Sequence, residues 1–376
     1  MLRAFVFYMK ILWFAHRDMQ NPRSGGAERT IEEICKRLVS YGHDVHLFTV
    51  AWKNAPLEVD FEGVKIHRTR GNIYTHFNHR RLLKKHEDAN VIVDDLGHVV
   101  PWSSNRMTNV PGVALFRHLH LRTLSGQVNL FKRIILVYLE KNYKYFYPNW
   151  EFVTESIVPA SDLERIGINP KRINIIKPGI DHNKFKCDID HIPGKVIYFA
   201  GMRKYKRADH AIIAFKQLLD VWSGPYNLKL VMIGNGPTFK ELKKLSDDLG
   251  LSDKVLFTGK LHDSDLIRTI SESSVNIHCS VEEGWCYSPL EASACGVPTV
   301  AYYNEGLADE IVDSVTGILC KEGDIKSLSI ALKEVIEKSS YYSTNCCLYS
   351  DSYSWDISAR QWEAMLKRIS ENRQKD

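Results

Sequence analysis

The sequence contains no uninterrupted run of about 18 apolar residues, the length that a membrane-spanning helix needs. Its apolar opening, residues 1–15, is interrupted by Lys10 and lacks a small-residue cleavage pattern, so we expect a strand there and not a signal peptide. The cysteines form neither a C-x-x-C pair nor a zinc-site spacing, which favours a reducing cytoplasm; they stand at positions 35, 187, 279, 286, 295, 320, 346 and 347. The net charge of +5 is modest and spread out, which argues against nucleic-acid binding and suits anionic small ligands or an anionic membrane surface.

The chain does contain enough apolar sequence for two domains. Its 376 residues are 44% hydrophobic and 25% charged, as in soluble globular proteins, and each half is long enough to bury a core. Pro178 and Gly179 interrupt regular structure, and residues 186–190 have no apolar period, which is typical of a linker. We therefore expect an N-terminal domain over residues 1–180, a second domain over residues 181–355 and a final helix over residues 356–376.

Both halves alternate short apolar runs with helical patterns, which predicts an α/β fold with two parallel sheets. Expected strands of the first half cover residues 10–15, 45–49, 91–95 and 112–116. Those of the second half cover residues 196–200, 229–233, 255–258, 275–279 and 299–302. Ligands of such sheets gather at the carboxyl ends of the strands.

Two adjacent glycines, Gly25 and Gly26, stand between the first strand and a helix expected from Ala27. Glycines at a helix start let a diphosphate approach the backbone without a clash with a Cβ atom, at the positive end of the helix. The alternative is a tight turn that requires a positive φ. The Gly-x-Gly-x-x-Gly dinucleotide fingerprint is absent from this turn.

Two carboxylates eight positions apart, Glu283 and Glu291, flank a turn that enters a helix. Glu283 is expected on the loop after the strand over residues 275–279, and Glu291 about one turn inside a helix opened by Pro289. Backbone N–H groups at such a helix start bind phosphates, and a carboxylate further in can accept hydrogen bonds from the vicinal hydroxyls of a ribose. Both side chains are then expected to face one crevice.

The stretch from Glu283 to Val300 resembles the E-x7-E signature of retaining glycosyltransferases of family 4, because Gly-Trp follows the first Glu and A-x-A-C-G-x-P-x-V follows the second. Further segments resemble the family at residues 25–29, 178–185, 305–312 and 316–319. The resemblance implies the GT-B fold, with two facing Rossmann-like domains, a donor cleft between them and a C-terminal helix that packs back on the N-terminal domain. It implies a donor site made by Gly25, Gly26, Arg203, Lys206, Gly234, Leu261, Glu283, Gly284, Trp285, Cys286, Tyr287, Ser288 and Glu291.

A basic cluster follows the first strand of the second half. In the family, an Arg and a Lys in this loop neutralise the departing diphosphate, where negative charge develops. Lys206 matches the Lys, and Arg203 is assigned to the Arg, with Lys204 as the alternative because the loop after Gly201 is one residue short. A solvated charged loop is the other interpretation.

Two histidines, His118 and His120, follow the strand over residues 112–116. They are candidates for a structural role, for a zinc pair that lacks a third ligand, or for contact with the transferred sugar or the acceptor, since family 4 enzymes carry a His at this strand end. We predict that His118 is catalytic and contacts the acceptor, with His120 as the second candidate. If the match to the family is shifted by one residue, Arg117 stands where the family has its His. Two D-x-D patterns fall in the linker at 188–190 and at a helix start at 263–265, so no catalytic metal is expected.

Residues 129–147 combine a helical apolar stripe with Lys132, Arg133, Lys141 and Lys144. An ordinary packed helix with a solvated basic face is one interpretation. Docking on anionic lipid is the other, because basic and aromatic residues favour that boundary.

The resemblance as a whole implies an enzyme that moves a hexose-type sugar from a UDP- or GDP-sugar to a glycan or lipid-linked acceptor, with retention of configuration. In that interpretation Glu283 holds the sugar and Glu291 the ribose, and neither a cofactor nor a nucleic-acid partner is involved. We expect it in the cytoplasm or at the inner face of the membrane. The alternatives are a GT-B epimerase or phosphorylase, and a relative that binds nucleotide sugars without catalysis.

Overall fold

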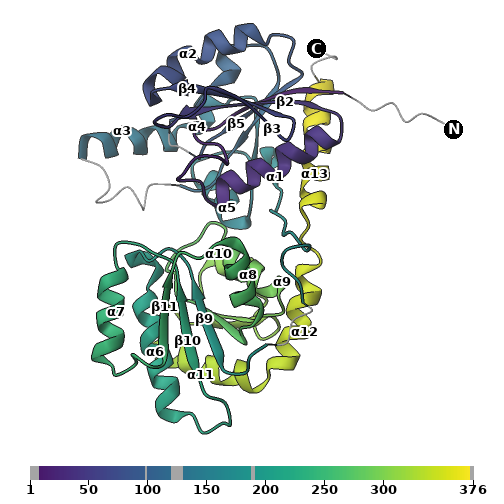
Figure 1. The fold of residues 1–376 in the computed structure, drawn as a ribbon. Coiled ribbons are helices and arrows are strands. Elements are labelled where there is room, and N and C mark those ends of the chain that lie inside the picture. Colours follow the sequence, from purple (N-terminus) through teal and green to yellow (C-terminus); the bar gives the residue numbers. More distant parts are fainter. Residues whose placement is uncertain (1–7, 98–99, 120–129, 188–190, 373–376) are drawn as a thin grey trace, which may run out of the picture. The chain divides into compact units, whose positions relative to one another are not determined.

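The computed structural model describes residues 8–97, 100–119, 130–187 and 191–372, apart from the side chains of residues 72–77 and 372. This chain separates into two compact units (Figure 1). The first unit comprises residues up to Gly179 together with those from Trp355 onward, and the second runs from Ile180 to Ser354. The expected α/β class with two parallel-sheet domains is confirmed.

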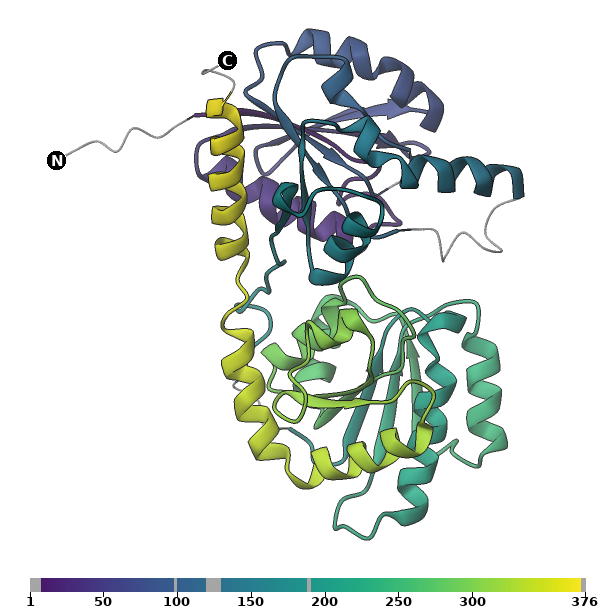
Figure 2. The same cartoon turned by 180° about the vertical axis from the view of Figure 1, so that it is seen from behind.

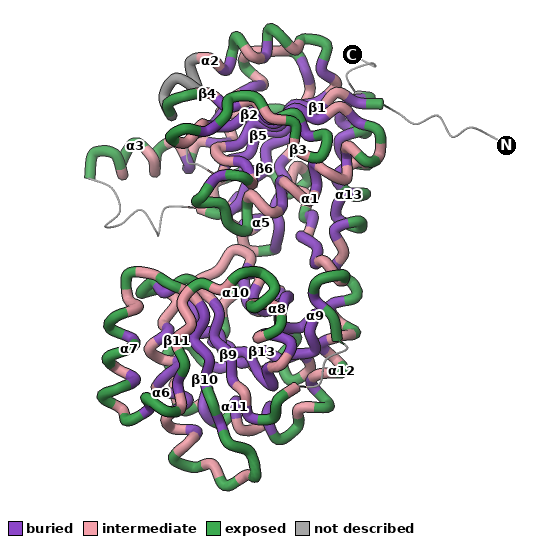
Figure 3. The backbone as a smooth tube through the Cα atoms, viewed as in Figure 1, coloured by how far each residue is buried: buried purple, intermediate pink, exposed green. Residues whose placement is uncertain are grey.

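The first unit is built on an eight-stranded sheet with the order β3-β4-β2-β1-β5-β6-β7-β8. Its strands are β1 (Lys10–Phe14), β2 (Asp44–Ala51), β3 (Glu58–Phe61), β4 (Val64–Arg70), β5 (Val91–Asp95), β6 (Gly112–Leu115), β7 (Glu151–Thr154) and β8 (Ile173–Ile175). Among these described strands, only the pair β3·β4 is antiparallel. The inner strands are buried on both faces (Figure 3), which explains their nearly continuous apolar sequences.

The helices of this unit are α1 (Gly26–Ser40), α2 (Asn72–Lys85), α3 (Leu130–Lys141), α4 (Tyr143–Phe146), α5 (Ile157–Arg165) and α13 (Trp355–Asn372). The apolar stripe of α1 is buried at Ile31, Ile34, Cys35 and Leu38. The last helix, α13, lies beside α1 (Figure 2). Trp362 of α13 packs on Trp13 of β1 with ring centroids 5.0 Å apart, so the end of the chain completes the core of its first unit.

The second unit contains a six-stranded, all-parallel sheet with the order β11-β10-β9-β12-β13-β14. Its strands are β9 (Lys195–Phe199), β10 (Lys229–Ile233), β11 (Val255–Gly259), β12 (Val275–His278), β13 (Thr299–Tyr302) and β14 (Gly317–Cys320). Its helices are α6 (Ala208–Val221), α7 (Phe239–Asp248), α8 (Asp263–Ser271), α9 (Tyr287–Ala294), α10 (Glu305–Ala308), α11 (Ile325–Glu337) and α12 (Ser339–Ser350). This strand order is that of the doubly wound fold, which reverses between β9 and β12.

Three details differ from the sequence-based expectations. The single helix expected up to residue 147 is divided at Asn142, whose side-chain amide donates to the carbonyl of Tyr138 at 2.6 Å. The helix expected from Pro289 begins two residues earlier, at Tyr287; Pro289 still lies in the first turn, where its missing N–H has no helical partner to lose. Cys187 and Cys347 form a disulfide across 160 positions, a bond that is rare in a reducing cytoplasm and that local cysteine spacing does not reveal.

Among the helices described here, none combines the length and the apolar character needed to cross a membrane. Asp263 and Asp265 occupy the first turn of α8, where acidic side chains favour the helix dipole. The other D-x-D pattern, at 188–190, lies outside the described residues.

Candidate functional site

The second sheet places two loops side by side at its point of reversal. Strands β9 and β12 are parallel neighbours. After β9 the chain continues to β10 on one side of this pair, and after β12 it continues to β13 on the other side. In open α/β sheets, the crevice outside the carboxyl ends of two such strands is the usual ligand site. The loop after β9 contains the short helix η3 (Lys204–Lys206), and the loop after β12 leads through Glu283 into α9.

A buried ion pair joins these two loops. The ammonium of Lys206 contacts Oε1 of Glu283, and Nε2 of His278, at the end of β12, lies 3.2 Å from the same oxygen. The side chains of Lys206 and Glu283 are only 13% and 10% exposed. Two of the residues predicted for one site are therefore in contact although they are 77 positions apart.

The neighbours of Glu283 set its ionisation. Burial would raise the pKa of Glu283, but the charge of Lys206 and the hydrogen bond from His278 lower it to about 2. The carboxyl group is therefore ionised at ordinary pH and can only accept hydrogen bonds, so Nε2 of His278 must donate. Burial alone would lower the pKa of Lys206, yet its interactions with Cys286 and Glu283 raise it above the ordinary value.

The residues after Glu283 are held from two sides. The backbone N–H of Cys286 donates to Oε1 of Glu310, just beyond α10. The hydroxyl of Ser288 lies 3.3 Å from Nδ1 of His278, and the thiol of Cys286 lies 3.7 Å from Nε2. Burial and the electrostatic interactions with the Cys286 thiol and the Glu283 carboxylate raise the pKa of Glu310 well above its ordinary value, although the hydrogen bond from the N–H of Cys286 lowers it.

Two glycines allow backbone segments to approach closely around the loops. A Cβ atom on Gly306 of α10 would lie 2.1 Å from the carbonyl oxygen of Glu283. A Cβ atom on Gly234 would lie 2.1 Å from the carbonyl oxygen of Ala200, and Gly234 has a φ of +131°. Both positions therefore require glycine.

The other predicted donor residues lie around these loops. Arg203 and its alternative Lys204 are exposed on the loop after β9. Glu291 is 7% exposed and lies in α9, beyond the loop that carries Glu283. Residues with intermediate exposure are Gly234, Leu261, Gly284, Trp285 and Tyr287.

At the start of α1 in the first unit, Gly25 and Gly26 are exposed. Gly25 has a φ of −150°, so the alternative of a turn with positive φ is wrong there. The carboxylate of Glu28 accepts a hydrogen bond from the N–H of Gly25 at 2.8 Å. An anionic group therefore already occupies this helix start, where a phosphate would otherwise find free N–H groups.

The end of β6 distinguishes Arg117 from His118. Arg117 is buried and forms ion pairs with Glu155 and, at 2.8 Å, with Asp95. It also donates to the carbonyl of Ala27 at 3.2 Å. His118 is exposed, so of these two residues it is the one that can meet a ligand. His120 lies outside the described residues.

His278 and Glu310 were not among the residues predicted from the sequence. For His278 a signal existed, since it is a titratable residue at the carboxyl end of a buried strand. Glu310 is 24 positions from its partner Cys286, and no local pattern points to their contact. Arg117 was considered only as an alternative to His118. Its ion-pair partners, Asp95 and Glu155, are far from it in the sequence, so no local pattern points to these contacts either.

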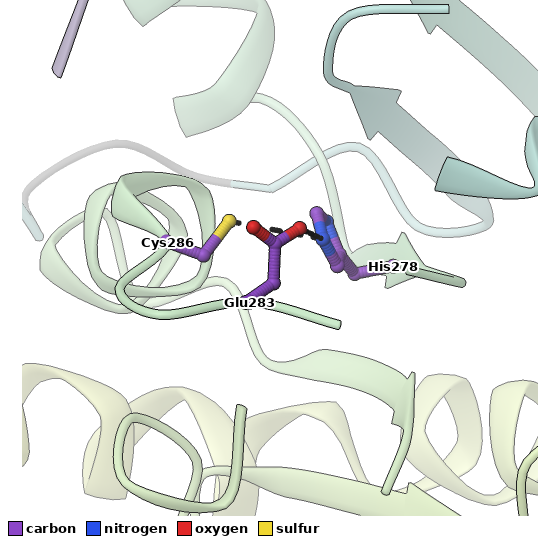
Figure 4. Close-up of side chains that lie close together, drawn as sticks. All are labelled: His278, Glu283 and Cys286. Atoms are coloured by element: carbon purple, nitrogen blue, oxygen red, sulfur yellow. Dashed lines mark hydrogen bonds and ion pairs between the residues drawn. The ribbon is translucent and has the colours of Figure 1, made fainter. Parts of the chain in front are cut away.

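His278, Glu283 and Cys286 each offer one atom suited to bind a metal ion, and these atoms lie within 4.8 Å of one another (Figure 4). This grouping was not expected, because the three residues match no zinc-ligand spacing in the sequence. Lys206 contacts the same carboxylate oxygen, Oε1 of Glu283, as His278 does.

The paired doubly wound sheets, with a charged site at the reversal of the second, define the GT-B class of glycosyltransferase folds. Residues 24–184 match the family model described as Glycosyltransferase Family 4, and residues 180–345 match the model described as Glycosyl transferases group 1. The chain belongs to the family 4 type of GT-B glycosyltransferases.

Known relatives agree with this assignment. An uncharacterized glycosyltransferase, MJ1069, of Methanocaldococcus jannaschii is 27% identical over 58% of this chain. The match covers 56% of that relative's length. A second from the same organism, MJ1607, is 23% identical over 90% of this chain and 93% of its own. The crystal structure of Anabaena Alr3699/HepE in complex with UDP and glucose superposes with a TM-score of 0.75, covering 96% of this chain and 100% of that one at 17% identity, and it shows the shared fold.

Proposed function

We propose that this protein transfers a hexose-type sugar from a UDP- or GDP-sugar to a glycan or lipid-linked acceptor, with retention of configuration. The observation that carries this proposal is the buried contact of Lys206 with Glu283 at the reversal point of the second sheet. In this proposal the cation serves the diphosphate and the adjacent carboxylate serves the sugar hydroxyls. The Anabaena relative in complex with UDP and glucose supports a UDP-sugar as the first donor to test.

In the proposed reaction, Lys206 exchanges Glu283 for the donor diphosphate. The ion pair with Glu283 keeps the ammonium charged and buried until the diphosphate arrives. Negative charge grows on the diphosphate as the glycosidic bond breaks, so Lys206 stabilises the transition state more than the bound donor. Glu283 and the backbone after it then hold the sugar, Arg203 assists with the diphosphate, and Glu291 accepts from the ribose.

Gly25, Gly26 and His118 complete this proposal in the first unit. The two glycines are proposed to contact the diphosphate after Glu28 has released the N–H of Gly25, and His118 to contact the sugar or the acceptor. No metal ion is needed for this reaction, since Lys206 and Arg203 supply the positive charge.

The test is a turnover assay on the purified chain with UDP- and GDP-sugars, read as release of nucleoside diphosphate and as the anomeric configuration of the product by NMR. Lys206→Ala should lower kcat on the order of 100-fold, the typical loss for one electrostatic stabiliser, with a smaller rise in the donor KM. An effect on KM alone would assign Lys206 to ground-state binding. An inverted product would contradict retention.

We further propose that α3 docks on an anionic membrane, which would suit a lipid-linked acceptor. Leu130, Phe131, Ile134 and Tyr138 are 60–73% exposed, so the apolar stripe of α3 faces outward, and the helix extends away from the sheet of its unit (Figures 1 and 2). An ordinary packed helix would bury this stripe. Lys132 and Lys141 are exposed on the same helix, which complements anionic lipid.

The membrane proposal predicts co-sedimentation with anionic vesicles at low salt and not with neutral vesicles. Each basic contact should add about 1 kcal/mol and be screened by salt. Reversal of Lys132, Arg133, Lys141 and Lys144 to Glu should abolish vesicle binding and leave nucleotide affinity unchanged. Equal sedimentation of the two proteins would instead point to a soluble glycan acceptor.

A further inference from the structure

We propose that His278, Glu283 and Cys286 bind a thiophilic divalent cation such as Zn²⁺, and that this cation competes with Lys206 for Glu283. The cation is an inhibitor in this proposal and not a participant in catalysis. Its binding does not depend on the proposed function, whereas its inhibitory effect does.

The distances among the three side chains suit a single ion. Nε2 of His278 lies 3.2 Å from Oε1 of Glu283 and 3.7 Å from Sγ of Cys286. Nitrogen, oxygen and sulfur ligands lie about 2.0 to 2.3 Å from a tetrahedral zinc ion, which places them roughly 3.2 to 3.7 Å from one another. The ligand atoms of the three residues are all within 4.8 Å, so only small side-chain rotations are needed (Figure 4).

The mixture of imidazole, thiolate and carboxylate selects the metal. A thiolate with an imidazole favours Zn²⁺ and similar ions such as Co²⁺ over Mg²⁺ and Ca²⁺, which prefer oxygen. Three protein ligands leave a fourth position open for water or a substrate group.

Neighbouring groups hold each ligand in place. The hydroxyl of Ser288 lies 3.3 Å from Nδ1 of His278 and can accept from it, which directs the lone pair of Nε2 toward the ion. The backbone of Cys286 is held by Glu310. His278 and Cys286 are 1% and 8% exposed, so their positions are set by packing as well. Metal sites require such support around their ligands.

Charge balance explains the competition with Lys206. On binding, Cys286 loses its thiol proton to solvent and bonds to the ion as a thiolate. The proton on Nε2 of a neutral His278 is replaced by one on Nδ1, so one proton is released in total. A divalent ion therefore adds one net positive charge to the cluster, next to the Lys206 ammonium that now contacts Glu283. The ammonium and the ion repel each other, and both need the same carboxylate.

An occupied site would stop the proposed transfer. The ion would hold Glu283, which is proposed to bind the sugar, and would displace Lys206 from its place beside it. Zn²⁺ should accordingly inhibit turnover, and a chelator should restore it.

The experiment is a titration of the chelator-treated chain with Co²⁺, followed by electronic absorption. We expect the near-ultraviolet band of a thiolate bound to Co²⁺. Cys286→Ser, a nearly isosteric change, should abolish the band, while Cys320→Ser, a buried cysteine at the end of β14, should keep it. Lys206→Met should tighten Co²⁺ binding by roughly tenfold, because it removes the competing charge.

A band that persists in Cys286→Ser, or Co²⁺ affinity that is unchanged or weaker in Lys206→Met, would overturn the proposal. Circular dichroism of each variant confirms that it is folded. Transfer activity without any Co²⁺ band would disprove the metal site and leave the proposed function standing. A Co²⁺ band in a protein that turns over no donor would leave the metal site standing and count against the proposed function.

Discussion

Two buried carboxyl groups, those of Glu283 and Glu310, have opposite pKa shifts. They are close in the fold, because Glu310 accepts a hydrogen bond from Cys286 on the loop that carries Glu283. Glu283 has Lys206 and His278 as partners, and its pKa falls to about 2. Oε1 of Glu310 accepts the neutral N–H of Cys286, and burial raises the pKa of Glu310. Identical side chains thus acquire opposite pKa shifts, because Glu283 is paired with a cation and Glu310 with a neutral donor.

These shifts predict opposite effects of pH on stability. Glu283 is easier to ionise in the folded state, so its contribution is present above about pH 4.5 and is lost as the pH falls toward 2. Glu310 holds its proton more tightly when folded, so it lowers stability as the pH rises above about 4.5. Glu310→Gln keeps the acceptor for Cys286 and cannot ionise. The free energy of unfolding of Glu310→Gln relative to wild type should therefore rise between pH 5 and pH 8 in urea titrations; parallel pH profiles would contradict a neutral Glu310.

At the scale of single elements, the loop after β1 is held by an ion pair that local sequence does not reveal. Arg68 of β4 donates to both oxygens of Asp18, at 2.8 and 2.9 Å, and neither side chain is exposed. Thr49 donates to the same carboxylate at 2.9 Å, and the guanidinium stacks over Trp52. This pair anchors the loop that leads to Gly25.

Removing one member of this pair should be costly. Arg68→Met leaves Asp18 buried without its countercharge, so the free energy of unfolding should fall by about 3–5 kcal/mol. Lys65 on the same strand pairs with Asp44 but is 49% exposed, so Lys65→Met should cost about 1 kcal/mol or less. Denaturant titration of the two variants compares them directly. A similar small loss in both would mean that the Asp18 pair adds little.

At the scale of the molecule, the chain makes two units and then returns to the first. Residues from Trp355 onward belong to the unit formed by the first 179 residues. Trp362 and Leu366 of α13 are 2% and 0% exposed, so this helix is part of the core and not a tail. The first unit therefore becomes complete only when α13 has been synthesised.

Trp362→Ala should destabilise the first unit by about 3–5 kcal/mol, the usual loss for a large buried aromatic side chain. Hydrogen exchange should become faster in β1 and β5 and stay unchanged in β9 and β12, because α13 packs on the first unit. Arg360→Ala on the exposed face of the same helix is the matched control and should change little. Faster exchange in both sheets would show that the units unfold together.

Local sequence was sufficient to predict the α/β class, most strands and the loop position of Glu283, because apolar periodicity and turn residues act over a few neighbouring positions. Which distant residues meet depends instead on tertiary packing. Lys206 reaches Glu283 because β9 and β12 become neighbours at the reversal of the sheet. Arg117 is buried because it pairs with Asp95, the last residue of β5, and with Glu155, the residue after β7, while His118 stays exposed. Strand order depends on the packing of the whole sheet, and no local pattern encodes it.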